Sequence, residues 1–237
     1  EGRTLESCEQ GGYTGDVVCD ICGKVIENGT TVEPSEHTPG DLENARENSC
    51  YLDGYTGDKY CTVCNTQLQQ GEVIPKLEHE YEDDVCKNCG RVNNAQLDIT
   101  YTSKTTEDYP YTVFQFTAPE SGRYTFTGDS EWDSYGYLYR ADKFNDSVIS
   151  AGMEMYYAKL KDNNASTPRL KDYWKSDDDS GIGPSPKITA ELTKGETYYF
   201  VFGPYSTEYG DFKLTITCVH TKTHVEGRTL ENCEQGG

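Results

Sequence analysis

The residues of this sequence best suited to chemistry are cysteines and histidines that recur at fixed spacing. A set near the N-terminus and its copy 42 residues later both follow the pattern C-x10-C-x2-C-x14-H: Cys8, Cys19, Cys22 and His37, then Cys50, Cys61, Cys64 and His79. Three thiolates and one imidazole are a usual donor set of a closed structural zinc site. The spacing therefore predicts one Cys3His zinc site within each repeat.

Each C-x2-C pair is expected to lie on a tight turn. A glycine follows the pair at Gly23 and again at Gly90, and Asn65 takes that place in the second repeat. Glycine and asparagine tolerate positive φ, which lets backbone N–H groups turn toward the thiolates. The GYTGD sequences at residues 12–16 and 54–58 are expected to build a turn before a short strand, without chemistry of their own.

A third Cys3His set is predicted from residues that are far apart in the sequence: Cys86, Cys89, Cys218 and His220. Cys218 and His220 are an i, i+2 pair, which at a strand end would point to one side. His224 is a rival ligand, because His220 and His224 with Cys86 and Cys89 would make a Cys2His2 set. Cys218 is alternatively the last buried position of a strand, because it continues the apolar alternation before it.

Three alternatives stay open to zinc sites whose four ligands all come from one repeat. Each histidine could serve the following repeat, because His37 precedes Cys50 by the same 13 residues that separate His220 from Cys233. The within-repeat register is preferred because the other register leaves incomplete sites at both ends. Ten cysteines could form a disulfide framework, although it gives the spaced histidines no role. A redox C-x2-C motif would need a surrounding βαβ pattern, which is missing.

The composition favours small modules in series over one large core. The 237 residues include 23 glycines and 19 tyrosines, and the mean hydropathy is -0.78. A net charge of -20 disfavours nucleic acid and anionic membrane surfaces as partners. No apolar run approaches the roughly 18 residues of a membrane span. Residues 226–237 repeat residues 1–12 with one change, so we expect a fragment of a longer array whose signal or anchor lies outside it.

A segment of different character lies between Cys89 and Cys218. Its apolar residues alternate as in half-buried strands, at Phe114 and Phe116, at Tyr124 and Phe126, at Ile188, Ala190 and Leu192, at Tyr198, Phe200 and Phe202, and at Phe212, Leu214 and Ile216. Short strands separated by turns predict a mainly β fold: an antiparallel jelly-roll-type β-sandwich inserted among small zinc-ribbon-like Cys/His repeats. Residues 144–172 alternate poorly and are interpreted as an insertion or long loop with one helical or strand piece.

These patterns set the expected boundaries. The predicted parts are repeat one at 1–42, repeat two at 43–84, the C-x2-C half of the third site at 85–95, the sandwich at 96–218, and the end of the third site with the start of a truncated repeat at 219–237. A folded insert holds its two ends at a fixed distance, so the third site would join the two chain segments at which the sandwich is inserted.

Two family resemblances follow from longer motifs. The run FQFTAPESGRYTFTGDSEWDSYGYLYRAD, followed by SDDDSG, ITAELTKGETYYFVFG and GDFKLTIT, resembles the bacterial pre-peptidase C-terminal domain, a secreted β-sandwich, over about residues 110–218. The matched positions are Gly122, Tyr124, Asp133, Asp177, Asp178, Gly195, Tyr198 and Gly210. Residues 144–172 depart from that family's compact hairpin. The Cys/His segments at 1–95 and 218–237 resemble GYTGD…CxxCG tandem repeats on surface proteins of gut anaerobic Firmicutes.

The resemblances imply an accessory role outside the cell or on its surface. Such modules accompany the catalytic domains of secreted hydrolases, or serve as spacers in surface proteins. No histidine is left for a Ser or Cys triad, so no catalytic residue and no enzyme activity are expected, although a carboxylate-only glycosidase stays open. One hypothesis is a structural module with about three zinc ions. The other is a carbohydrate- or protein-binding module of a secreted hydrolase.

Two further candidate sites lie in the sandwich segment. Asp177, Asp178 and Asp179, with Asp133 as the position that the family places nearby, would supply hard oxygen donors for calcium. The alternative is a solvated run of charge. Trp132 and Trp174 could stack against a polysaccharide or contact a surface protein, or they could pack at the edge of the sandwich.

Overall fold

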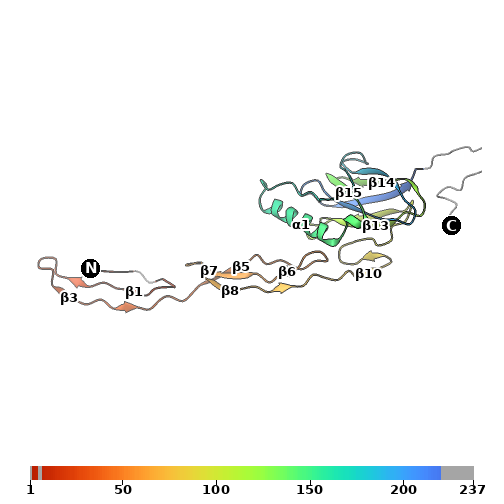
Figure 1. Ribbon diagram of the computed structural model, residues 1–237. Coiled ribbons are helices and arrows are strands. Elements are labelled where there is room, and N and C mark those ends of the chain that lie inside the picture. The colour runs from red at the N-terminus through yellow and green to blue at the C-terminus, as the bar shows by residue number, and fades with distance from the viewer. Residues whose placement is uncertain (1, 5–6, 220–237) are drawn as a thin grey trace, which may run out of the picture. The chain divides into compact units, whose positions relative to one another are not determined.

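The computed structural model describes residues 2–4 and 7–219 of the chain (Figure 1). The chain divides into two compact units. The repeat unit is Glu1–Asn48 with Asp53–Lys76, and the sandwich unit is Ser49–Leu52 with Leu77–Gly237. Among the described residues, no helix has both the length and the apolar character needed to cross a lipid bilayer.

The repeat unit consists of two irregular antiparallel β-hairpins, one from each repeat. Its strands are β1 (Gly12–Tyr13), β2 (Val17–Val18), β3 (Val25–Glu27), β4 (Thr31–Val32), β5 (Pro39–Glu43), β6 (Gly54–Tyr55), β7 (Asp58–Cys61), β8 (Gln67–Gln69) and β9 (Val73–Ile74). In the first hairpin β1 pairs with β4 and β2 with β3, and in the second β6 pairs with β9 and β7 with β8. Strand β5 adds to the other edge of β7. Each C-x2-C pair therefore lies at a hairpin tip.

A tyrosine–aspartate pair fastens each hairpin between its base and its tip. The Tyr55 hydroxyl donates to Asp58 Oδ1 at 2.6 Å, and the Gly71 N–H donates to the same oxygen at 2.9 Å. These two donors, the hydroxyl first, lower the pKa of Asp58 below its usual range. The first repeat makes the same contacts with Tyr13, Asp16 and Gly29. The GYTGD motif thus joins the two arms of its hairpin as well as forming a turn.

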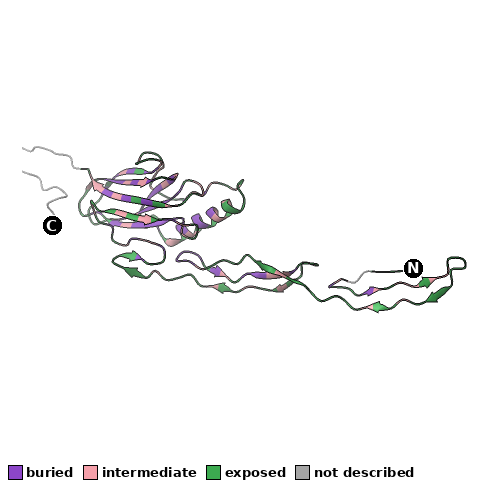
Figure 2. Ribbon diagram, turned by 180° about the vertical axis from the view of Figure 1, so that it is seen from behind, coloured by how far each residue is buried: buried purple, intermediate pink, exposed green. Residues whose placement is uncertain are grey.

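The repeat unit has almost no apolar core. Among its described residues, the buried hydrophobic side chains are Cys8 and Cys61 alone. Large apolar side chains such as Val17, Ile21 and Val73 are exposed. The colour of exposed residues covers much of the trace of both hairpins in Figure 2. Two-stranded hairpins are marginal in water without a packed face. Hydrophobic burial therefore does not account for the stability of the repeat unit.

Eight antiparallel strands of the sandwich unit form its two four-stranded sheets. They are β12 (Thr100–Lys104), β13 (Thr112–Thr117), β14 (Gly122–Ser130), β15 (Ser134–Arg140), β16 (Lys175–Asp177), β17 (Lys187–Leu192), β18 (Thr197–Pro204) and β19 (Asp211–Cys218). The sheet orders are β12-β19-β14-β17 and β13-β18-β15-β16. The first strand of the eight pairs with the last and the second with the seventh, which is the jelly-roll arrangement. The predicted fold class is confirmed.

Aromatic residues fill the space between the two sheets. Phe126 on β14 stacks on Phe200 of β18 with ring centroids 5.3 Å apart, and Phe202 stacks on Phe212 at 4.1 Å. These side chains are at most 2% exposed. They occupy the alternating positions from which the sequence predicted strands. Cys218 ends β19 partly buried against the same core, as the alternation also suggested.

The outer face of the β13-β18-β15-β16 sheet is covered as well. A helix, α1 (Asp146–Lys161), follows a 3₁₀ turn, η1 (Ala141–Lys143), and lays Ile149 and Met153 against Tyr137 and Val201 of the sheet. Figure 2 shows the buried stripe along this helix. The helix lies within the segment 144–172 that the sequence identified as an insertion.

The same buried layer includes the segment around Cys50 in the second repeat. Cys50, Tyr51 and Leu52, with Cys86 and Cys89, belong to the cluster beneath α1. Cys86 ends a short strand, β11 (Val85–Cys86), which pairs with β10 (Tyr81–Glu82). The part of the second repeat that carries Cys50 is thus packed into the sandwich unit.

Candidate metal centres

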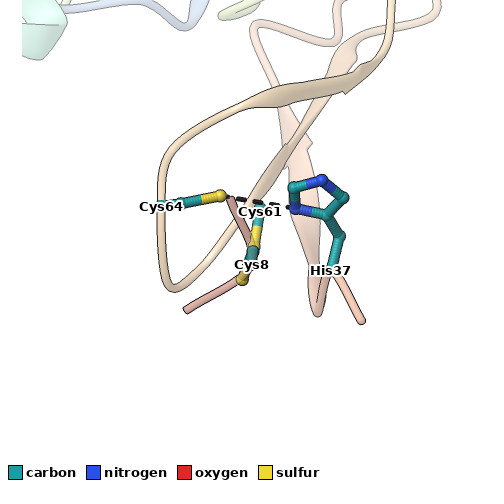
Figure 3. Close-up of side chains that lie close together, drawn as sticks. All are labelled: Cys8, His37, Cys61 and Cys64. Atoms are coloured by element: carbon teal, nitrogen blue, oxygen red, sulfur yellow. Dashed lines mark hydrogen bonds between the residues drawn. The ribbon is translucent and has the colours of Figure 1, made fainter. Parts of the chain in front are cut away.

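The first group of metal-type side chains is formed by Cys8, His37, Cys61 and Cys64. Cys8 precedes the first hairpin and His37 follows it, whereas the two other cysteines lie at the tip of the second hairpin. Pro39 of β5 is paired with Cys61 of β7, which places His37 beside that tip. Figure 3 shows the four side chains converging from these separate segments. Their donor atoms all lie within 4.8 Å of one another.

Distances in the first group fit a tetrahedral ion. A metal held by sulfur at about 2.3 Å and nitrogen at about 2.05 Å requires S–S distances near 3.8 Å and S–N distances near 3.6 Å. The Cys8 and Cys61 sulfurs are 3.6 Å apart, and Cys64 Sγ is 3.3 Å from His37 Nδ1. The four donors therefore enclose a space of the right size for one ion.

The C-x2-C turn prepares its thiols to ionise. Burial raises the pKa of Cys61, but the backbone N–H groups of Cys64 and Val63 and the His37 ring outweigh burial and lower this pKa to about 5. The pKa of His37 is raised by Cys61 first and Cys64 second. A thiolate, not a thiol, binds a metal. The turn thus favours the charge state that coordination needs.

The second group of metal-type side chains is Cys50, His79, Cys86 and Cys89, and it lies wholly in the sandwich unit. His79 Nδ1 is 3.4 Å from both Cys86 Sγ and Cys89 Sγ, and the Cys50 and Cys86 sulfurs are 4.0 Å apart. All three cysteines are buried, whereas His37 of the first group is exposed. The second group therefore offers the same types of donor atom, but they are less exposed to solvent.

An outer layer of polar side chains supports the second group. His79 Nε2 lies 3.5 Å from Asp146 Oδ2, an ion-pair distance that is too long for a good hydrogen bond. Arg91 Nη1 holds the other oxygen of Asp146 at 2.7 Å. A histidine that gives one nitrogen to a metal and turns the other to a carboxylate is a common arrangement around bound metals. Tyr51 adds a hydroxyl 3.6 Å from Cys89 Sγ.

The electrostatics of the second group distinguish its cysteines. The contact with Cys50 is the first cause that lowers the pKa of Cys89, to about 5, and the Arg91 N–H and the Tyr51 hydroxyl add to it against the effect of burial. The same contact raises the pKa of Cys50 well above its usual range. Without a cation, one of these sulfurs retains its proton. A divalent ion in their midst would stabilise both thiolates.

The grouping expected within each repeat is wrong. Cys8 and His37 meet Cys61 and Cys64 of the next repeat, and Cys19 and Cys22 of their own repeat join no group among the described residues. The reason is the hairpin itself. Its strands keep the C-x2-C pair at the tip, away from the residues that enter and leave at the base. Each histidine does serve the C-x2-C pair that follows its repeat, as the alternative register expected, but it brings the first cysteine of its own repeat, Cys8 or Cys50, which neither register predicted.

The third predicted set is also corrected. Cys86 and Cys89 take Cys50 and His79 as neighbours. Cys218 is disulfide-bonded, which removes it as a thiolate ligand. His220, together with its rival His224 and Cys233, lies outside the described residues. The partners of Cys86 and Cys89 therefore come from the second repeat, as Cys50 and His79, and not from the C-terminal strand of the sandwich.

The four aspartates predicted as calcium ligands do not converge as the Cys/His groups do. Asp133, Asp177, Asp178 and Asp179 form no group of three or more metal-type donors within the described chain. Asp177 accepts instead from the Ser180 and Lys187 backbone N–H groups, as turn residues do. Burial, followed by the charges of Asp179 and Glu208, raises the pKa of Asp133. Calcium binding here stays a prediction.

Both candidate stacking residues are packed. Trp132 donates its Nε1–H to the Asp211 carbonyl at 3.0 Å and meets Phe202 edge to face. Trp174 stacks with Tyr198, and the Arg140 guanidinium lies 4.3 Å from its ring centroid. The two side chains rest partly buried against the sandwich core. These contacts agree with packing at the edge of the sandwich.

Sequence reasoning missed the supporting residues Tyr51, Arg91 and Asp146. One signal was present in the repeat itself. Where the first repeat has Glu9 and Gln10, the second has Tyr51 and Leu52, and the polar pair has become an apolar pair. Such a change predicts burial at the base of the second hairpin. Nothing comparable marks Asp146, which reaches the site only because α1 folds over the sheet.

Comparison with known proteins gives weak likenesses of fold. No family profile and no curated protein matches the sequence. Among solved structures, the pre-peptidase C-terminal domain of collagenase from Bacillus anthracis matches with 12% identity over 53% of this chain and 93% of that chain, at a TM-score of 0.34. PliG, a periplasmic inhibitor of g-type lysozyme from Aeromonas hydrophila, matches with 9% identity over 52% and 92%, at 0.33.

A third solved structure, the Yersinia pseudotuberculosis-derived mitogen, matches with 15% identity over 57% of this chain and 95% of that chain, at a TM-score of 0.30. At these values the likenesses carry no argument about function. The jelly-roll assignment rests on the strand order, and the chemistry rests on the two Cys/His groups.

Proposed function

We propose that this chain is a non-catalytic structural module in which zinc ions fasten each repeat to the next part of the chain. One observation carries the proposal. In both groups, a cysteine and a histidine 29 residues apart meet a C-x2-C turn that comes later in the chain. The first ion would join the two hairpins of the repeat unit. The second would secure the base of the second repeat within the sandwich unit.

The donor set favours zinc over other metals. Soft thiolates with one imidazole select zinc among common divalent ions, whereas magnesium and calcium prefer oxygen donors. Four protein donors also leave no open position for a substrate or a reactive water. Both described histidines are used in this way, so neither is free to act as a catalytic base. The proposed ions are therefore structural.

The weak core of the repeat unit makes such ions important for folding. Binding of a structural zinc contributes about 10–16 kcal/mol in small zinc-dependent peptides. A typical domain has a net stability of only about 5–15 kcal/mol. One ion is thus large enough to compensate for a unit whose buried hydrophobic side chains are two of its own cysteines.

An exported location, outside the cell or on its surface, belongs to the same proposal. The disulfide at Cys218 supports it, because disulfides persist in oxidising compartments. A net charge of -20 favours solubility and disfavours nucleic acid. The packing of Trp132 and Trp174 favours a spacer role for the sandwich over polysaccharide binding. A glycan array probed with the chain and with a Trp132→Ala, Trp174→Ala variant tests that choice, and binding lost in the variant would reverse it.

Metal content of matched variants tests the proposed function. The purified chain is expected to carry two zinc ions, measured by native mass spectrometry and elemental analysis. Cys64→Ser should lose or greatly weaken one ion, whereas Cys22→Ser, the equivalent change one repeat earlier, should retain both. A chain that carries no metal, with the cysteines of both groups oxidised, would refute the proposal.

A further inference from the structure

The turn at Cys19 and Cys22 has the same backbone as the two turns that belong to complete groups. The first cysteine of each pair donates its N–H across the turn, to Lys24 from Cys19, to Thr66 from Cys61 and to Arg91 from Cys86, at 2.8–2.9 Å. The residue after each pair returns an N–H to that first cysteine, and it has positive φ: 68° at Gly23, 61° at Asn65 and 71° at Gly90. The first turn is therefore already shaped as a metal-binding turn.

The surroundings of this first turn are incomplete in one specific way. Strand β7, which leads into the second turn, pairs with β8 on one edge and β5 on the other. Its counterpart β2 pairs with β3, and no second partner lies along it within the described chain. Cys61 is 2% exposed, but Cys19 is only partly covered and Cys22 is exposed. The missing layer is the one that β5 and His37 supply to the second turn.

The described residues hold no donor pair to fill that place. Cys8 with His37 and Cys50 with His79 are the two Cys-x28-His pairs, and each already faces a C-x2-C turn. Cys19 and Cys22 remain free cysteines. We propose that Cys19 and Cys22 are the receiving half of a further zinc site, completed by the Cys-x28-His pair and following strand of another repeat of this kind.

This inference rests on the proposed zinc sites and extends their chemistry. Each repeat would have a donor end, made by its cysteine and histidine, and a receiving end, made by its C-x2-C turn. Repeats of this kind would then join donor end to receiving end, with one ion and one strand pairing at every junction. The partner is thus a further repeat of the same sequence type whose own Cys-x28-His pair is not yet engaged, because both described pairs of this chain already face C-x2-C turns.

Extension of the chain by one repeat tests the inference directly. A copy of residues 1–42 placed before Glu1 keeps the repeat register and adds one Cys-x28-His pair. The chain alone is expected to bind two zinc ions tightly, and the extended chain three. Replacement of the cysteine and histidine in the added repeat by Ser and Ala is the matched control. That control, and a Cys19→Ser, Cys22→Ser change at the original positions of the extended chain, should both return the count to two.

The outcomes separate this inference from the function on which it rests. A chain without zinc would refute both. Two ions in the chain and still two in the extended chain would refute the inference alone. Light scattering identifies the source of the donors: a third ion in a monomeric extended chain supports joining within one chain. The unextended chain could instead dimerise and hold an extra ion between the C-x2-C turns of its two copies. That result would also overturn the inference.

Discussion

At the scale of single residues, the two metal groups differ in what surrounds the histidine. His37 is exposed, while His79 is held between two thiols and the Asp146 carboxylate, which Arg91 fixes in turn. A carboxylate behind a metal-bound histidine orients the ring and strengthens it as a ligand. The second group should therefore bind its ion more tightly than the first.

Asp146→Asn tests the role of that carboxylate. The amide retains the size of the side chain but removes its charge, so zinc affinity at the second group should fall by about 10–100-fold. Competition with a chromophoric chelator measures it, with the first group as an internal reference. Asp142→Asn, in the neighbouring 3₁₀ turn, is the control and should change neither site. Equal affinity in Asp146→Asn and the unmodified chain would show that Asp146 does not act on the metal.

At the scale of elements, the hairpin explains both the success and the failure of sequence reasoning. The ligand types and the C-x2-C turn could be predicted, since both depend on local spacing. The partners of Cys8 could not be predicted, because the hairpin keeps its base, with Cys8, away from its tip, with Cys19 and Cys22. Choosing the grouping that gives the most complete Cys3His sets takes no account of that distance. The correct choice required the pairing of β5 with β7, a contact between two repeats.

In the sandwich, too, the sequence predicted the elements with a clear local pattern and missed those whose pattern depends on packing. Strands β13, β14, β17, β18 and β19 were evident from alternation of large apolar residues. Strand β15 alternates less clearly because both of its faces are buried: Leu138 points to the inter-sheet core, and Tyr137 and Tyr139 point to the layer beneath α1. The helix lacked a strong periodic pattern, and its partners come from the second repeat and the sheet.

A glycine substitution tests the fastening of the second hairpin. A Cβ at Gly71 would lie 2.7 Å from both the Gly57 carbonyl oxygen and the Tyr55 ring. Gly71→Ala should therefore destabilise the repeat unit by about 1–3 kcal/mol, the usual cost of overpacking. Urea unfolding of the zinc-loaded chain measures it. Gln70→Ala, at the exposed neighbouring position, is the control, and equal unfolding midpoints for the two variants would contradict the observed packing.

At the scale of the whole molecule, the two units depend on different forces. The sandwich has an aromatic core between two sheets, while the repeat unit has two buried cysteines and hydrogen-bonded hairpins. Removal of metal should therefore affect them unequally. With a strong chelator, the repeat unit should unfold, while the sandwich keeps its near-ultraviolet circular dichroism from Tyr and Trp.

Hydrogen exchange read by mass spectrometry assigns that loss to particular segments. After chelation, peptides from β1 to β9 should exchange fully within seconds, and peptides from β13, β14 and β18 should stay protected. Addition of zinc should restore protection in the hairpins. Protection that is lost together in both units, or kept in both, would contradict the separate origins of their stability.

The central claim is that each metal joins donors from successive parts of the chain. Cadmium-113 NMR of the cadmium-substituted chain tests it most directly, because scalar coupling connects each ion to the β-protons of its own cysteines. We expect one ion coupled to Cys8, Cys61 and Cys64, and a second coupled to Cys50, Cys86 and Cys89. Coupling of one ion to Cys8, Cys19 and Cys22 would contradict the account and place each site within a single repeat.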